Sequence, residues 1–401
     1  MACSAGRFLC SPSIRERAQP LCLVGAAAAI GAAAWGPDPR TLPLSLLLPS
    51  LWVSARSRAT AAAVAVGYFL AASRGLPRGV ATFFSTDLVD GLALWLGAAL
   101  VFTTVYASLW TRSPGVGSAL RWLAATILMA VPPLGIVGWA GPITAAGVVI
   151  PGWGWAGLVA TLGLMLGQMV DRSRRAALVI LAGLSVWGAA TWSPPASPPG
   201  WIGLDLAWGR ALGRDMSLEA HERLIDETLG AVHEGVRNVI LPENALGVLT
   251  PTVEAIWAER LRETGITVLA GATGVRLEGW DNVLVAIDGT GAHVVYRQRV
   301  PVPVAMWQPW RAVFGEKTGA GARLLGSATA AVAGHRIVPL VCYEQLLVWP
   351  VLEAMRREPD IVAAVGNGWW TSGTDIIGIQ RSAVSSWARL FGVSVVVAFN
   401  D

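Results

Sequence analysis

Apolar residues dominate the first half of the chain, and the second half is more polar. The first half contains seven apolar runs, at residues 20–36, 42–55, 59–73, 91–110, 122–140, 143–170 and 176–192. A helix needs roughly 20 apolar residues to cross the hydrocarbon core of a bilayer. The runs therefore predict a polytopic α-helical membrane bundle of about seven helices over residues 1–192. The second and third runs are short for a span, so they could extend into their flanks or re-enter, which would change the count by one or two.

A proline-rich segment, residues 193–200, separates this half from a domain with a different pattern. Two Pro-Pro pairs in eight residues are typical of a stiff, extended linker. Short apolar runs typical of strands then alternate with helical patterns, which predicts a layered α/β domain over residues 201–401. We expect its elements at residues 202–206 (strand), 217–234 (helix), 236–241 (strand), 250–263 (helix), 282–296 (hairpin), 375–390 (helix) and 393–399 (strand).

Composition and charge placement assign a class and an orientation to the first half. The mean hydropathy of +0.54 and the 14% of charged residues are unusual for a soluble chain of this length. With the amino terminus in the cytoplasm, ten arginines fall in inner segments and three in outer ones, as the positive-inside rule requires. An odd number of spans then places the second domain in the periplasm of a bacterial inner membrane. The inner arginines are Arg7, Arg15, Arg17, Arg56, Arg58, Arg112, Arg121, Arg172, Arg174 and Arg175, and the outer ones are Arg40, Arg74 and Arg78.

The candidate chemistry of the second domain is a thiol and a carboxylate at the ends of two expected strands. Cys342 follows the apolar run 337–341, and Glu243 follows the run 239–242. A carboxylate that can act as a base beside a single thiol nucleophile is a pair of residues suited to acyl transfer. The alternative is a small buried cysteine and a salt-bridged glutamate. The four histidines are scattered singly, so no metal site is expected, and no cofactor or nucleic-acid patch is indicated.

Six short motifs occur in order along residues 201–401. They are Leu241-Pro242-Glu243-Asn244, Asp281-Asn282, Tyr296-Arg297-Gln298-Arg299 with Pro303, Val341-Cys342-Tyr343-Glu344, Gly366-Asn367-Gly368-Trp369-Trp370 and Ala398-Phe399-Asn400. With these motifs, this part of the chain resembles the carbon-nitrogen hydrolase (nitrilase) domain, which implies an α-β-β-α sandwich. A membrane bundle in front of such a domain is similar to apolipoprotein N-acyltransferase and to acyltransferase-like proteins of conjugative plasmids; the chain is expected to be short at its carboxyl end relative to these proteins.

The resemblance implies a triad of Glu, Lys and Cys, and the chain departs from it at one position. Where the lysine is expected, the sequence has Gln298. The one lysine of the chain, Lys317, lies in a later loop, so Arg299 is the preferred source of positive charge. The expected catalytic set comprises Glu243, Cys342, Glu344, Gln298 and Arg299.

Aromatic residues near these motifs are expected to bind substrate, because amphipathic rings suit a lipid-chain groove next to a bilayer; the alternative is ordinary packing under a long loop. The resemblance implies a membrane phospholipid as acyl donor and a lipoprotein or a component of the conjugation machinery as partner. The alternative is a catalytically degenerate domain that acts as an accessory or assembly factor in conjugation. The expected substrate-binding residues are Tyr343, Trp307, Trp310, Trp369 and Trp370.

Overall fold

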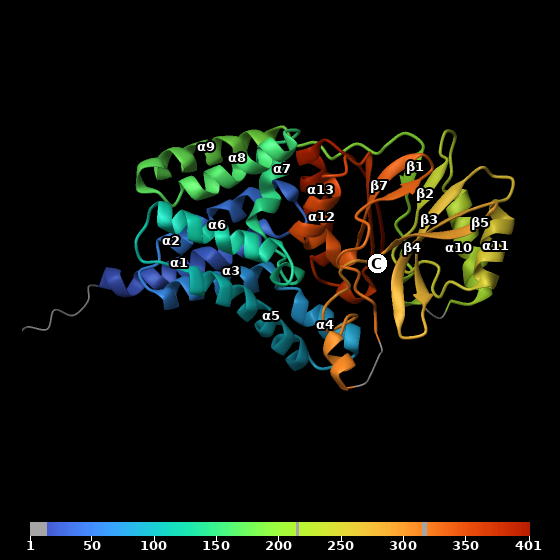
Figure 1. The fold of residues 1–401 in the computed structure, drawn as a ribbon, viewed down its shortest axis with the longest axis horizontal. Coiled ribbons are helices and arrows are strands. Elements are labelled where there is room, and N and C mark those ends of the chain that lie inside the picture. Colours follow the sequence, from blue (N-terminus) through green and yellow to red (C-terminus); the bar gives the residue numbers. More distant parts are fainter. Residues whose placement is uncertain (1–13, 214–215, 315–318) are drawn as a thin grey trace, which may run out of the picture.

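The computed structural model describes residues 14–213, 216–314 and 319–401 and contains a helical region followed by a two-sheet sandwich (Figure 1). The helices of the first region range from 4 to 22 residues and are separated by turns and 3-10 segments. They are α1 (Ile14–Ala34), α2 (Leu48–Val53), α3 (Arg58–Ala72), α4 (Leu76–Phe84), α5 (Leu88–Leu109), α6 (Val116–Ala130), α7 (Ala146–Val149), α8 (Gly154–Gly167) and α9 (Asp171–Ala190).

The prediction of seven membrane-spanning helices is not confirmed. Within the described residues, only α5 is long and apolar enough to cross a bilayer, and the number rises to three if two bent pairs each count as one span. One pair is α3 with α4, bent by 54°, and the other joins residues 142–149 to α8 with a bend of 119°. The expected span at 42–55 is a 3-10 helix followed by the six-residue α2.

The second region contains a five-stranded and a four-stranded sheet. In the first sheet, β1 to β3 run parallel and β3 to β5 antiparallel; in the second, β7 to β9 run parallel and β6 pairs antiparallel with β7. The first sheet contains β1 (Trp201–Gly203), β2 (Asn238–Ile240), β3 (Thr267–Val275), β4 (Trp280–Asp288) and β5 (Gly291–Arg297), and the second contains β6 (Ala330–Val332), β7 (His335–Val341), β8 (Ile361–Asn367) and β9 (Ser394–Asn400).

Helices cover the outer face of each sheet, so the layers are helix, sheet, sheet and helix. Helices α10 (Leu218–Gly230) and α11 (Pro251–Leu261) pack on the first sheet, and α12 (Val348–Met355) and α13 (Ile376–Phe391) pack on the second. Between the sheets, Ile240, Leu284 and Val365 belong to one buried apolar cluster. This alternation of inward and outward apolar side chains produces the expected α-β-β-α sandwich.

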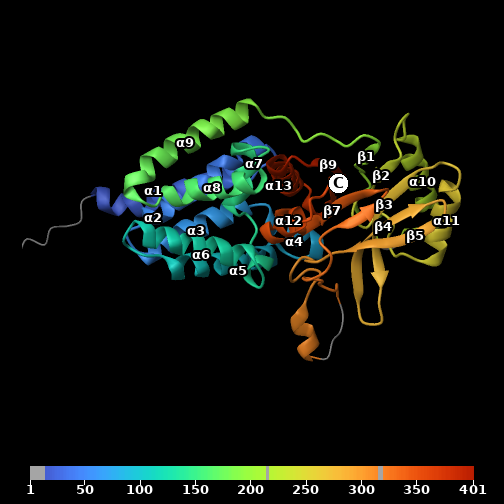
Figure 2. The same cartoon turned by 45° about the horizontal axis from the view of Figure 1, so that its top comes forward.

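The helical region packs directly on the outer side of α13. Figures 1 and 2 both show α12 and α13 between the first-half helices and the sheets. The Ser382 hydroxyl donates to the carbonyl oxygen of Gly36, and Ser386 donates to that of Thr144. Apolar residues of both regions form a single buried cluster. The orientation of the sandwich relative to the helices is therefore fixed by packing.

Residues 193–199 carry no helix or strand and lead from α9 to β1 along the outside of α13 and β9 (Figure 2). The amide of Val395 in β9 donates to the carbonyl oxygen of Ala196 at 3.1 Å. The proline-rich segment is thus attached to the edge of the second sheet.

Candidate active site

Cys342 occupies a strained position at the end of β7. Its φ angle is +49°, in the left-handed region that non-glycine residues rarely adopt. The strand ends at Val341, and the next residues start a short 3-10 turn. Such strain is common at functional positions, where it directs a side chain out of the regular strand pattern. The thiol is buried, with 7% of the residue exposed.

The carboxylate of Glu243 lies against this thiol. Glu243 follows β2 and accepts hydrogen bonds from Asn282 Nδ2 at 2.6 Å and from the Asn367 amide at 3.1 Å. The Cys342 thiol donates a further hydrogen bond to the carboxylate. The ends of β2, β4, β7 and β8 thus bring the predicted base and nucleophile together.

Burial favours the neutral form of both groups. It raises the pKa of Glu243 to about 7, although the hydrogen bonds from Asn282 and Asn367 lower it. Burial also raises the pKa of Cys342 well above its usual value, and the nearby Glu243 charge raises it further. The thiol is therefore protonated at neutral pH, and Glu243 is placed to remove its proton only as the sulfur attacks.

Gln298, at the position of the expected lysine, takes part in an amide network. Its Oε1 accepts from Asn282 Nδ2 at 2.9 Å, and its Nε2 donates to the carbonyl oxygen of Val341 at 3.0 Å. The same Asn282 nitrogen also donates to Glu243. Gln298 therefore links the base to the strand that carries Cys342, but it supplies no positive charge.

Arg299 was expected to supply that charge, and the structure places its guanidinium elsewhere. The guanidinium pairs with Glu353 and donates to the carbonyl oxygen of Pro350 at 2.9 Å and to the Tyr296 hydroxyl at 3.4 Å. It also lies 4.8 Å from the ring centre of Trp349. These partners hold the side chain against α12. The preference for Arg299 as the source of charge is therefore not supported, whereas Gln298 binds Val341, the residue before Cys342; Lys317 lies outside the described residues.

Glu344 is buried and binds backbone amides. Its carboxylate accepts from the amides of Arg299, Val300 and Val341 at 2.7, 3.1 and 3.0 Å, and from the Tyr296 hydroxyl at 2.9 Å. These bonds join the end of β5 to the turn that carries Cys342. The geometry makes Glu344 a positioning residue for the nucleophile.

A cavity of about 660 Å³ opens onto Glu243 and Cys342. Its other walls are largely apolar and come from both halves of the chain. The wall from the first half is α4, which contributes Leu76, Val80, Phe83 and Phe84, and the wall from the second half includes Trp280, Met306, Trp369 and Trp370.

Two of the five expected substrate-binding residues line this cavity. They are Trp369 and Trp370. Tyr343 donates its hydroxyl to the carbonyl oxygen of Ile136 at 3.0 Å, and Trp307 packs on the cluster around Val300 and Leu347. Trp310 is 45% exposed and is absent from the cavity wall. The expectation for these three residues is therefore not met in this structure.

Helix α4 is held against the cavity by a close contact with Trp370. A β-carbon added at Gly79 would lie 2.6 Å from this ring, so the approach requires glycine. Phe83, on the same helix, stacks on Trp369 with ring centres 5.8 Å apart. Helix α4 and the two tryptophans thus form one packed wall.

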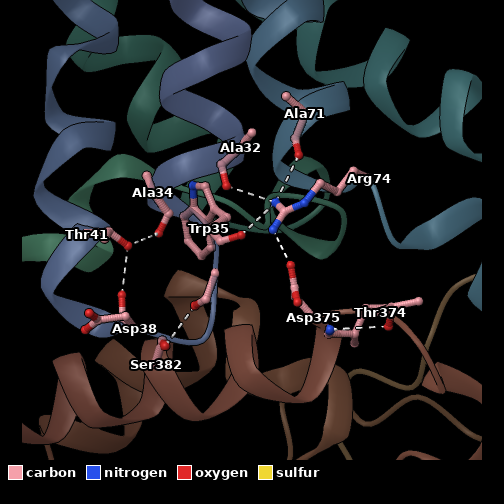
Figure 3. A network of polar contacts seen from close by, with 12 residues as sticks. Ala32, Ala34, Trp35, Asp38, Thr41, Ala71, Arg74, Thr374, Asp375 and Ser382 are labelled. Atoms are coloured by element: carbon pink, nitrogen blue, oxygen red, sulfur yellow. Dashed lines mark hydrogen bonds and ion pairs between the residues drawn. The ribbon is translucent and has the colours of Figure 1, made fainter.

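Arg74 holds the turn between α3 and α4 in place (Figure 3). Its guanidinium donates to the carbonyl oxygens of Ala32, Trp35 and Ala71 at 3.0, 2.9 and 3.5 Å and pairs with Asp375, next to the start of α13. The carbonyl groups belong to the last turns of α1 and α3, where a positive charge is favourable. The turn between α3 and α4 therefore binds the sandwich at the loop that carries Trp369 and Trp370.

Three amide residues of the site were missed as functional residues in the sequence. Asn282 and Asn367 bind Glu243, and both lie within motifs that carried the family resemblance. Gln380 of α13 donates from Nε2 to the Cys342 sulfur at 3.8 Å, and nothing in the pattern of its helix distinguishes it. No cluster of three or more metal-binding side chains occurs among the residues that the structure describes.

Comparison with known proteins places this site in a family. The model of the carbon-nitrogen hydrolase family matches residues 70–389. A probable conjugal transfer protein TraB of Sinorhizobium fredii is 47% identical over 386 residues, which cover 96% of this chain and 99% of the relative. The conjugal transfer protein TraB of Agrobacterium fabrum is 46% identical over 407 residues, with 99% and 96% covered.

Among solved structures, an amidase from a Nesterenkonia species is 14% identical, with a TM-score of 0.38 over 52% of this chain and 78% of the amidase. The family match covers most of both regions, and the two full-length relatives are conjugal transfer proteins named TraB. The chain therefore belongs to the carbon-nitrogen hydrolase family.

Proposed function

We propose that the chain is a membrane-bound acyltransferase that takes an acyl group from a membrane phospholipid onto Cys342. The observation that carries the proposal is the cavity of about 660 Å³, in which the Glu243 and Cys342 pair faces apolar walls. A mostly apolar pocket with a few convergent polar groups is typical of a ligand site. Because α4 belongs to the first-half helices, an acyl chain could enter the cavity from the side of those helices.

Apolar side chains exposed on α5 support the membrane location. Leu92, Leu96 and Leu100 are 37%, 47% and 59% exposed, and they follow one another at helical spacing. Exposed leucines on a 22-residue apolar helix are expected where lipid surrounds the helix. Together with the arginine asymmetry, they favour an inner-membrane protein with a periplasmic sandwich.

The first step would form a thioester. Glu243 accepts the thiol proton while the Cys342 sulfur attacks the ester carbonyl carbon of the phospholipid. The tetrahedral intermediate then collapses, the bond from carbon to the ester oxygen breaks, and the leaving alcohol receives the proton from Glu243. The products are an acyl thioester on Cys342 and a lysophospholipid.

The second step would transfer the acyl group to an amine. The amine nitrogen attacks the thioester carbonyl carbon, and Glu243 accepts a proton from the nitrogen. The carbon–sulfur bond then breaks, and Glu243 returns this proton to the leaving sulfur to restore the Cys342 thiol. The Gln380 amide and the backbone amide of Tyr343 both bind the sulfur, so they favour the thiolate that leaves in this step.

The relatives named as conjugal transfer proteins suggest where the acyl acceptor belongs. We assign the acceptor to a lipoprotein or another component of the conjugation machinery on the periplasmic side. The proposed role is thus the lipid modification of a partner in plasmid transfer.

A second candidate function is an accessory role without catalysis, and the observation that favours it is Gln298. The network around Gln298 is neutral and closed by its bonds to Asn282 and Val341. A missing transition-state donor costs roughly 10²- to 10³-fold in rate. Such a loss is compatible with a scaffold that retains the fold of an enzyme.

The release of lysophospholipid tests the proposal. The full chain, purified in a neutral detergent, would be incubated with phospholipid and an amine acceptor, with Cys342→Ala as the matched control. Acyl transfer predicts lysophospholipid that depends on Cys342. If wild type and Gln298→Lys both release no more than Cys342→Ala, while plasmid transfer still requires the protein, the accessory role is correct.

A further inference from the structure

Three arginines converge on a single buried aspartate at one end of the first sheet. Asp281 Oδ1 lies 3.0 Å from Arg276 Nε, and Oδ2 lies 2.8 Å from Arg297 Nη1 and 3.1 Å from Arg323 Nη2. The aspartate side chain is 1% exposed, whereas the arginine side chains are 35%, 44% and 45% exposed. The four residues form what we call the arginine cluster.

The arginine cluster carries more positive charge than its own aspartate neutralises. Three guanidinium groups surround one carboxylate, which leaves an excess of two positive charges among these four side chains. Each guanidinium has five N–H donors, and the carboxylate has two oxygens to accept them. Arg276 Nη2 donates to the carbonyl oxygen of Trp280 at 3.3 Å. The guanidinium groups still offer more donors than these acceptors use, and the three side chains are partly exposed, so a second anion could bind there.

The arginine cluster lies on the opposite face of β4 from the active site. Successive side chains of a strand point to opposite faces, and Asn282 points to Glu243 between the sheets. Asp281 therefore points outward, on the same face as Arg297, which is paired in register with Val283. The cluster is outside the cavity and is not used in the proposed acyl transfer.

Large apolar side chains are exposed beside the arginine cluster. Leu277, in the turn between β3 and β4 and next to Arg276, is 107% exposed, and Leu325, two residues after Arg323, is 97% exposed. Val275 pairs with Trp280 and lines the active-site cavity, so it belongs to the opposite face. Exposed apolar residues next to arginines are typical of a surface that lies in the interfacial layer of a membrane. In the same hairpin, Glu278 is engaged in an interaction of its own.

We propose that the arginine cluster binds the phosphate of an anionic phospholipid headgroup, while the neighbouring apolar tip enters the interface. Planar guanidinium groups recognise phosphate oxygens through paired N–H donors, and the two non-bridging oxygens of a phosphodiester can accept hydrogen bonds from several such donors at once. The proposal rests on the membrane location proposed above, but it needs no chemistry at Cys342. It assigns the protein a second lipid site that orients the sandwich on the membrane surface.

Lipid binding to the full chain in a neutral detergent tests this site, with the Cys342→Ala background used throughout so that no lipid is consumed. Native mass spectrometry would give the affinities for phosphatidylglycerol and for phosphatidylcholine with the same acyl chains. We expect tighter binding of phosphatidylglycerol. The double variant Arg297→Gln with Arg323→Gln should weaken that binding roughly tenfold or more, as expected for lost charge-assisted hydrogen bonds. Arg262→Gln, at an exposed arginine that follows α11 and pairs with Glu259, should leave it unchanged.

Asp281→Asn provides a test that does not depend on removing arginines. Without the competing carboxylate, affinity for phosphatidylglycerol should rise. If this variant only lowers the melting temperature, the arginines serve to hold Asp281 and the proposal is wrong. Unchanged phosphatidylglycerol binding in a folded double variant would also overturn it. So would binding of inorganic phosphate without binding of the lipid, because the site would then take a free anion.

Discussion

At the scale of single residues, the site combines one carboxylic acid and one thiol with amide side chains. Asn282, Gln298 and Gln380 donate hydrogen bonds to Glu243, to the Val341 carbonyl and to Cys342, respectively. An ammonium group in this network would stabilise the ionised forms of both the acid and the thiol. In its absence, burial dominates and the pKa of Glu243 rises to about 7. Thiol reactivity should therefore depend on pH in the neutral range.

The rate of Cys342 acylation by a short activated ester should rise with pH through about 7 and then level off. Below this pH, the Glu243 carboxyl group is protonated and cannot accept the thiol proton; above it, the carboxylate is available. Glu243→Gln should remove this inflection and slow the reaction roughly 100-fold or more. Stopped-flow measurements from pH 5 to 8.5, with Cys342→Ala as the blank, check this. A variant that kept the wild-type profile would rule out Glu243 as the base.

Gln380→Ala should slow the same reaction by about three- to tenfold, because the thiolate loses one hydrogen-bond donor. Gln345→Ala is the matched control. Gln345 is also a buried glutamine of this layer, but it donates only to the carbonyl oxygens of Leu340 and Val365. It should lower the melting temperature with little change in the pH profile of the thiol. Equal effects of the two variants on that profile would show that Gln380 acts only through packing.

The positions of the two reactive groups could be predicted from the sequence. The contacts of the charged residues around them could not. Glu243 and Cys342 both follow apolar strands, but β2 and β7 belong to different sheets, so the packing of the two sheets brings these strand ends together. Arg299 lies beyond the end of β5, where its backbone amide binds Glu344 and turns the side chain toward Glu353. The orientation of the Arg299 side chain thus depends on the carboxylate of Glu344, which lies in the 3-10 turn after β7. No local sequence pattern around Arg299 predicts this contact. In the same way, no local pattern in α13 predicts that Gln380 binds the Cys342 sulfur.

At the scale of elements, hydrophobicity predicted the strands and helices of the sandwich but not the number of membrane spans. The run at 42–55 is apolar because it is buried inside the helical region; Leu42, Leu46 and Trp52 are at most 1% exposed. A run that packs on protein has the same composition as one that faces lipid. Helix α4 likewise belongs by sequence to the helical half, yet it forms a wall of the active-site cavity.

Enlarging Gly79 should disturb this wall. The β-carbon of a leucine would lie 2.6 Å from the Trp370 ring, which must move, at a cost of about 1–3 kcal/mol. We expect Gly79→Leu to lower the melting temperature and to reduce acyl transfer most for long-chain donors. Gly97→Leu on α5 is the control, because no atom lies within 4 Å of its added β-carbon. If Gly79→Leu reduced acyl transfer from long-chain and short-chain donors equally, α4 would not contact the acyl chain.

At the scale of the whole molecule, the α13 layer joins two regions that the sequence separates with a proline-rich segment. Buried residues of α13 such as Trp387 pack in one cluster with Val148 of α7 and Leu46 of the first half. Composition alone distinguishes the two regions but contains no sign of this contact. The sandwich is therefore held in one position relative to the helical region.

Reporter fusions test the proposed orientation. A fusion at residue 115, next to Arg112 and Arg121, should report the cytoplasm, and one at residue 199, in the linker, should report the periplasm. An even number of spans between residues 115 and 199 would put both fusions on the same side. A cytoplasmic signal at residue 199 would remove the argument for a periplasmic acceptor.

The central claim is that Cys342 carries an acyl group from a phospholipid. Intact-protein mass spectrometry after incubation with phospholipid and no amine acceptor tests it most directly. We predict a mass increase of one acyl chain that maps to Cys342, disappears with hydroxylamine as a thioester should, and is absent from Cys342→Ala. A wild-type protein that remains unmodified under these conditions, while its melting temperature shows that it is folded, would contradict the claim.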